Sequence, residues 1–143
     1  MNTMSGILKA RTRFHHIGLL TRDEGQAVQL LQALGYEVGE PVVDPVQNAT
    51  LRMACGPEGN PDIEIIVPSP ENSGLWQLLK RRDDYMYHLC YTTDDRTGII
   101  ESLAIAGATV HEISPPKEAS LFGGRAVSFY AVAGLGLIEF LED

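Results

Sequence analysis

Two short apolar stretches decide the fold: Phe14-His15-His16-Ile17-Gly18-Leu19-Leu20 and, later in the chain, Met86-Tyr87-His88-Leu89-Cys90-Tyr91. Each places a histidine inside a run of apolar residues, which is typical of a buried strand. A shift of 72 residues superimposes His16 on His88. Because this shift is about half of the 143-residue chain, a single repeat accounts for nearly the whole protein.

The landmarks that follow each histidine keep the same register. The 72-residue shift also brings Asp23 onto Asp95 and Gly35 onto Gly107. Asp is a frequent helix N-cap, and Gly commonly ends a helix because it adopts the left-handed conformation at little cost. The shared register therefore predicts an internal duplication in which each half holds one helix after its first strand.

The periodicity of apolar residues gives each half the order strand, helix, strand, strand, strand. In the first half, Ala27, Leu30, Leu31 and Leu34 follow the i, i+3, i+4, i+7 spacing of an amphipathic helix. We expect strands at 14–20, 36–43, 50–54 and 62–67 with a helix at 26–34, and then strands at 86–91, 109–113, 125–132 and 135–141 with a helix at 97–106 and a loop at 115–124.

The expected fold class is therefore α+β, built from two tandem βαβββ modules. Module 1 spans about 13–68 and module 2 about 85–143, and together they form a single domain over 1–143. The linker at 69–84 is expected to hold a short helix that packs on the body of the protein through Trp76.

Four residues with metal-binding chemistry take matching places in the two halves. His16 and His88 lie on the first strand of each half, and Glu64 and Glu139 lie on the last. Alternation along a strand can aim any single glutamate at solvent. Two glutamates at equivalent positions, each matched to an equivalent histidine, favour a shared metal site instead.

The sequence around the two glutamates supports this interpretation. Each stands inside an apolar strand, Ile63-Glu64-Ile65-Ile66 in the first half and Leu137-Ile138-Glu139-Phe140 in the second. Burying a carboxylate costs several kcal/mol unless it is paired or metal-bound. Two imidazoles and two carboxylates suit one divalent ion, Zn²⁺, Co²⁺, Ni²⁺, Mn²⁺ or Fe²⁺.

Composition narrows the classes of partner. The net charge of −8 repels phosphate backbones, so we expect no nucleic-acid partner. No stretch of about 18 apolar residues and no signal peptide is present, which predicts a cytoplasmic protein without a membrane partner.

Cys55 and Cys90 both lie in apolar runs and are expected to be buried, reduced thiols. We expect a small-molecule substrate and a homodimer.

Five segments together resemble the vicinal oxygen chelate superfamily, which includes glyoxalase I, extradiol dioxygenases, fosfomycin-resistance proteins and methylmalonyl-CoA epimerase. The resemblance covers nearly the whole chain and is nearest to the epimerase. The segments are His15-His16-Ile17-Gly18, Leu34-Gly35-Tyr36, Ile63-Glu64-Ile65-Ile66-Val67-Pro68, Tyr87-His88-Leu89-Cys90-Tyr91 and Leu137-Ile138-Glu139-Phe140-Leu141.

The resemblance implies a curled mixed sheet around a metal-binding cleft, with substrate oxygens on the open positions of the metal. It implies that Glu139 serves as both ligand and catalytic base. The segment Phe122-Gly123-Gly124-Arg125 is similar to the loop that enters the penultimate strand of relatives and is expected to bind substrate. For Arg125, a hairpin turn followed by a surface arginine is the competing interpretation.

One departure bears on the activity. Epimerisation by a two-base route needs a second acid or base on the opposite face of the substrate carbon. In some epimerases a glutamate on the third strand of the first module supplies it, whereas here that strand reads Thr50-Leu51-Arg52-Met53-Ala54. Proton return would then come from water, from Glu139 itself, or from a loop residue such as Glu58 or Glu118.

Several functions stay open at this stage. The first is a metal-dependent isomerase or epimerase that forms an enolate next to a carbonyl, with an acyl-CoA or similar thioester as substrate. A glyoxalase-I-like lyase shares the alternating His and Glu ligands. An iron enzyme with a 2-His-1-carboxylate site is disfavoured by Glu64, which would close a position that oxygen needs. A non-catalytic small-molecule binder of the resistance type is the remaining alternative.

Overall fold

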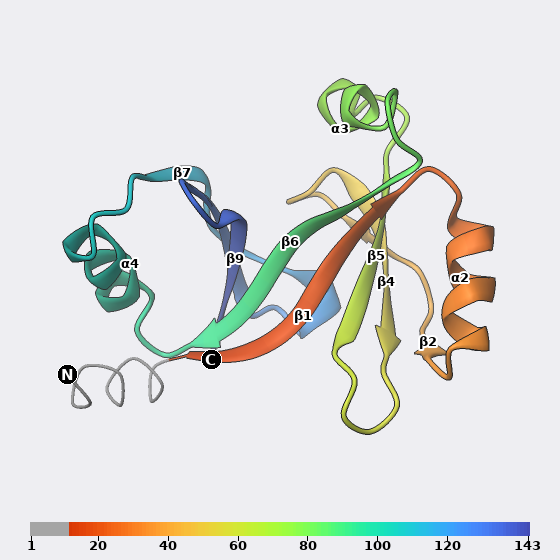
Figure 1. Cartoon of the computed structure of the whole chain (residues 1–143), viewed down its shortest axis with the longest axis horizontal. Helices are drawn as coiled ribbons and strands as arrows, with labels where there is room; N and C mark the ends of the chain where they lie inside the picture. Colours follow the sequence, from red (N-terminus) through yellow and green to blue (C-terminus); the bar gives the residue numbers. More distant parts are fainter. Residues whose placement is uncertain (1–11) are drawn as a thin grey trace. The chain divides into compact units, whose positions relative to one another are not determined.

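In the computed structural model, which describes residues 12–143, strands and helices follow the order expected from the sequence (Figure 1). The first half holds β1 (Thr12–Thr21), α2 (Glu24–Ala33), β2 (Glu37–Val38), β3 (Val42–Asp44), β4 (Ala49–Cys55) and β5 (Asp62–Pro68), followed by α3 (Ser73–Leu78). The second half holds β6 (Asp84–Thr93), α4 (Arg96–Ile105), β7 (Val110–Glu118), the 3₁₀ turn η1 (Ser120–Phe122), β8 (Ala126–Val132) and β9 (Gly136–Glu142).

The nine strands found within residues 12–143 hydrogen-bond as one mixed, open sheet. Its order is β2-β4-β5-β1-β6-β9-β8-β7, with β3 paired to β4. The pairs β1/β5 and β6/β9 are parallel, and the β4/β5 and β8/β9 pairs are antiparallel. The expected α+β fold class is confirmed.

The described chain clusters into two compact units. One contains residues 16–87 and 120–123, and the other contains residues 12–15, 88–119 and 124–143. The short segment 120–123 thus packs with the first half of the chain although it belongs to the second half in sequence. Each unit has its own apolar core.

Both long helices begin and end with the same local chemistry. Asp23 accepts a hydrogen bond from the backbone N–H of Gln26 at the start of α2, and Asp95 does the same for Gly98 at the start of α4. Each helix ends before a glycine with positive φ, 96° at Gly35 and 95° at Gly107. These residues are the capping pairs that the sequence register predicted.

In each unit the helix covers one face of the strands (Figure 1). On α2, Leu31 packs with Ile63 and Ile65 of β5. On α4, Ile99 packs with Tyr130 of β8 and Ile138 of β9. Because side chains alternate along a strand, His16, Glu64, His88 and Glu139 lie on the faces that the helices leave uncovered.

The strand expected at 36–43 is wrong as a single element. Two short strands, β2 and β3, replace it. The backbone N–H of Gly39 donates a hydrogen bond to the carbonyl of Met53. Pro41, two residues later, has no N–H and cannot donate to a neighbouring strand. The chain therefore leaves the edge of β4 at β2 and rejoins it at β3.

The loop expected at 115–124 is also wrong over its first part, because β7 continues to Glu118 through Pro115 and Pro116. Two features explain how proline is accepted here. β7 ends the strand order, so one of its edges needs no partner. Its pairing with β8 is also irregular between Ser114 and Lys117, where the two prolines stand.

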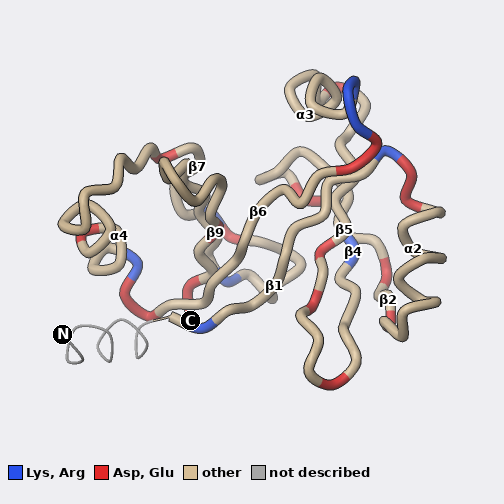
Figure 2. The backbone as a smooth tube through the Cα atoms, in the orientation of Figure 1, with Lys and Arg blue, Asp and Glu red and all other residues tan. Residues whose placement is uncertain are grey.

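Figure 2 shows basic residues gathered beside α3, where Lys80, Arg81 and Arg82 follow the helix, in a chain whose net charge is −8. Among residues 12–143, no helix is long and apolar enough to cross a membrane.

The caps give a test of the fold. Asp23→Ala removes the acceptor for the Gln26 N–H, so we expect the free energy of unfolding to fall by about 1 kcal/mol in urea titrations. Asp23→Asn keeps an oxygen acceptor and should retain most of that stability. Equal losses in the two variants would contradict the capping role.

Candidate metal centre

The first His/Glu pair lies on neighbouring parallel strands of one unit. His16 stands on β1, and Glu64 stands on β5 opposite Gly18. Both side chains are fully buried, and His16 Nε2 lies 3.7 Å from Glu64 Oε2. Parallel neighbours share a face, so the two side chains project from the same side of the sheet.

The second pair has the same layout in the other unit. His88 stands on β6, and Glu139 stands on β9 opposite Cys90. His88 Nε2 lies 3.0 Å from Glu139 Oε1, and both side chains are buried. In each pair the glutamate is opposite the residue two positions after the histidine, as expected if both arose from one ancestral half.

An aromatic ring contacts each imidazole. Phe122 stacks on His16 with ring centroids 5.7 Å apart and an interplanar angle of 18°. Phe129 of β8 meets His88 edge-on at 5.3 Å and 83°. These contacts restrict the rotation of both imidazoles and keep their surroundings apolar.

The two cysteines differ in their environment. Cys90 is buried, as expected, whereas Cys55 is exposed, so the expectation for Cys55 is wrong. Cys55 ends β4, where the strand leaves the core for the turn that begins at Gly56.

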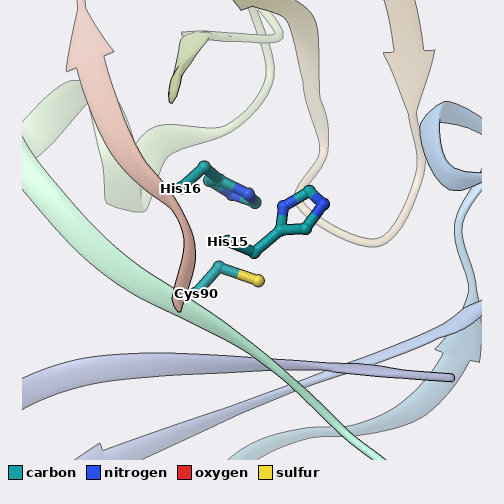
Figure 3. A group of neighbouring side chains, drawn as sticks. All are labelled: His15, His16 and Cys90. Carbon is teal, nitrogen blue, oxygen red and sulfur yellow. The ribbon is translucent and has the colours of Figure 1, made fainter. Parts of the chain in front are cut away.

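Figure 3 shows Cys90 and His15 next to each other beside His16, with a ligand atom of His15 within 4.8 Å of the Cys90 thiol.

One buried carboxylate was missed by the sequence interpretation. Asp44, at the end of β3, is 3% exposed. Its Oδ1 accepts a hydrogen bond from Val46 N, and its Oδ2 accepts one from Gln47 Nε2. Asp44 lies just beyond the strand expected at 36–43, and the three-residue β3 strand that ends on it is too short to give a periodicity signal.

Gln47 was missed as well. Its Nε2 also donates to Glu64 Oε1, at 3.2 Å. A glutamine in a turn ordinarily faces solvent, and the residues around Gln47 do not show that its amide reaches a strand 17 residues later in the chain.

β4 presents an apolar surface on the side of the first His/Glu pair. In the β4/β5 register Met53 is opposite Glu64, and Leu51 is opposite Ile66. These residues share the face of Glu64, as alternation predicts for Leu51 and Met53. The face offers no carboxylate from β4.

The segment expected to bind substrate divides between the two units. Phe122 packs on His16, and Gly123 and Gly124 have φ of 66° and 85°, which glycine adopts readily. Arg125 donates through Nε to the carbonyl of Glu142, and its Nη2 lies 3.2 Å from Asp143 Oδ1. Substrate binding by this segment stays a prediction.

Tyr87 directly precedes His88 in the sequence. Burial raises the pKa of its phenol above the ordinary value of 10.0, so this side chain stays neutral at physiological pH. It therefore adds no charge close to His88.

The donor chemistry of the two pairs fits a divalent metal. Glu64 and Glu139 are both buried, and burying two carboxylates is unfavourable without compensating positive charge. His nitrogens and carboxylate oxygens are ordinary ligands for Zn²⁺ and for the divalent ions of the late first transition row.

Comparison with known families gives one match over most of the chain. Residues 15–129 match the family described as the Glyoxalase/Bleomycin resistance protein/Dioxygenase superfamily. No curated protein matches the sequence.

Solved structures share the fold at low sequence identity. A methylmalonyl-CoA epimerase from Mycobacterium tuberculosis is 19% identical, with a TM-score of 0.72, covering 90% of this chain and 86% of the epimerase. A hypothetical protein from Bacillus halodurans C-125 is 20% identical, with a TM-score of 0.72 and coverages of 92% and 94%. A variant methylmalonyl-CoA epimerase from Streptomyces coelicolor, in complex with 2-nitronate-propionyl-CoA, is 22% identical, with a TM-score of 0.69 and coverages of 93% and 98%.

Proposed function

Because the chain belongs to the glyoxalase/bleomycin resistance protein/dioxygenase superfamily, we propose that it is a metal-dependent enzyme that removes a proton next to a carbonyl group. The proposed metal ligands are His16, Glu64, His88 and Glu139. The proposed substrate is a small acyl thioester such as an acyl-CoA. A homodimer and a cytoplasmic location stay predictions.

The matched layout of the two His/Glu pairs is the observation that supports this proposal most. One ligand atom from each of the four residues lies within 4.8 Å of the others. The chain passes from one compact unit to the other between His15 and His16 and between Tyr87 and His88.

The proposed reaction needs a bound cation and a base, and residues of this chain would supply the metal ligands and the base. A bound divalent ion supplies positive charge that stabilises an enolate oxygen. A carboxylate has two oxygens, so Glu139, whose Oε1 lies 3.0 Å from His88 Nε2, would both help to hold the ion and accept the α-proton. Phe129 packs on His88 and excludes water from this side of the imidazole, which strengthens electrostatic interactions there.

The thioester class rests on chemistry and on the structural neighbours. The α-proton of a thioester is weakly acidic, so one carboxylate and one cation suffice to remove it. One neighbour is an epimerase in complex with 2-nitronate-propionyl-CoA, and another is in complex with methylmalonyl-CoA. These ligands make acyl-CoA thioesters the first substrates to test.

The metal is tested first. Protein purified without chelator should contain about one divalent ion per chain. His16→Ala and His88→Ala each remove one ligand and should sharply lower the metal content measured by elemental analysis. His111→Ala, which changes an exposed histidine of β7, is the matched control. Unchanged metal content in both site variants would falsify the proposed site.

Glu139 is tested by separating metal binding from proton transfer. Glu139→Gln keeps an oxygen ligand but accepts a proton poorly. We expect metal to be retained at reduced affinity and α-proton exchange on thioesters to slow by about two orders of magnitude or more. Exchange is followed by deuterium incorporation from D₂O. A wild-type exchange rate would remove Glu139 from the role of base.

Whether the substrate is inverted depends on a second base, and the strand face around Glu64 offers none from β4. Leu51 and Met53 line it on β4, and both carboxylate oxygens of Asp44 already accept hydrogen bonds. A single base exchanges the α-proton on one side of the carbon, so we expect methylmalonyl-CoA to exchange with little inversion. Deuterium incorporation and inversion are measured in the same sample. Inversion at rates typical of metabolic enzymes, ~1–10³ per second, would reveal a second base.

A further inference from the structure

We propose that Gln47 is a positioning residue that holds Glu64 as a ligand through one oxygen, and that Asp44 clamps Gln47 from its other side. This inference rests on the proposed metal site. Gln47 lies in a turn and Asp44 lies beside it. Both would help to orient Glu64, the carboxylate ligand of the first His/Glu pair.

A single nitrogen links the two carboxylates. Gln47 Nε2 lies 3.3 Å from Asp44 Oδ2 and 3.2 Å from Glu64 Oε1. An amide NH₂ carries two hydrogens, so it can donate one to each acceptor. The amide oxygen could not take this place, because neither ionised carboxylate can donate to it. The two hydrogen bonds therefore fix which end of the amide faces Glu64.

The hydrogen bond divides the roles of the two Glu64 oxygens. Oε1 accepts from Gln47, while Oε2 is the oxygen that approaches His16 Nε2, at 3.7 Å. The oxygen nearest the imidazole is the one assigned here to an ion shared with His16. A ligand held in this way binds through one oxygen and keeps its orientation.

The turn that carries Gln47 is itself anchored. The Asn72 side chain donates to the carbonyls of Gln47 and Asn48, and its Oδ1 caps α3 by accepting from Leu75 N. Asn48 has a φ of 51°, in the left-handed region that Asn tolerates better than most residues. The backbone of Gln47 is thereby held between β3 and α3.

The position of Gln47 leaves one of its polar atoms without a hydrogen bond among the described residues, which is unfavourable for stability. Its Oε1 is buried and accepts no hydrogen bond within residues 12–143. A buried acceptor without a partner is unfavourable by about 1–3 kcal/mol. Such a cost is typical of a side chain whose position serves a site rather than the stability of the fold.

Metal affinity and ligand geometry test the role. Gln47→Met keeps a similar volume and removes both hydrogen bonds. We expect its dissociation constant for Zn²⁺, measured by competition with a chromophoric chelator, to rise about 10–100-fold, as for other residues that orient a ligand. The visible absorption of bound Co²⁺ should change as well, because Glu64 becomes free to bind through both oxygens. Gln32→Ala, on the exposed side of α2, is the control.

A double variant tests the clamp. Asp44→Ala removes the oxygen that accepts from Gln47 Nε2, so it should also weaken Zn²⁺ binding. If Asp44 acts through Gln47, adding Asp44→Ala to Gln47→Met should weaken binding no further. Thermal unfolding of each metal-free variant shows whether it is folded.

The outcomes separate this inference from the proposed function. Wild-type affinity and an unchanged Co²⁺ spectrum in Gln47→Met would overturn the positioning role alone. Additive losses in the double variant would overturn the clamp. Failure of the wild-type protein to bind Zn²⁺ would overturn the proposed metal site and this inference with it.

Discussion

Two carboxylates buried inside apolar strands set the constraint on which the candidate site depends. Glu64 and Glu139 lose the water that would stabilise their charge, and replacing that stabilisation requires donors or a cation. Each has a histidine on the neighbouring parallel strand, and Glu64 also accepts a hydrogen bond from Gln47. The same burial that makes these groups costly would make their attraction to a divalent ion strong.

Strand pairing explains how the fold meets this constraint twice. In both units a parallel neighbour brings the glutamate opposite the residue two positions beyond the histidine. Gly18 and Cys90 are the residues at these opposite positions, and both are small enough to leave the carboxylate room. The helices α2 and α4 pack on the reverse faces, so the apolar core and the polar pair occupy opposite sides of the same strands.

Much of the fold could be predicted from the sequence because its signals are local. Helix periodicity, the capping residues Asp23 and Asp95, and the glycines at 35 and 107 each act within a few residues. The failures arise where the outcome depends on residues far away in the sequence. Proline in β7 reads as a loop unless one knows that the strand lies at an edge, and the break between β2 and β3 depends on where β4 lies in space.

The candidate site was predictable only in its repeated part. The sequence points to His16 and Glu64 because His88 and Glu139 stand at matching positions in the second half. Asp44 and Gln47 have no such counterpart in the pattern, and their link to Glu64 spans a turn and a strand, so neither periodicity nor spacing points to them.

X-ray absorption spectroscopy of the Zn²⁺-loaded protein tests the shared His/Glu metal site most directly, because it reports the atoms bound to the ion. A site made by His16, Glu64, His88 and Glu139 predicts only nitrogen and oxygen ligands at about 2.0–2.2 Å, with the multiple scattering of two imidazoles. A sulfur ligand at about 2.3 Å would contradict it and point instead to Cys90, which lies beside His15.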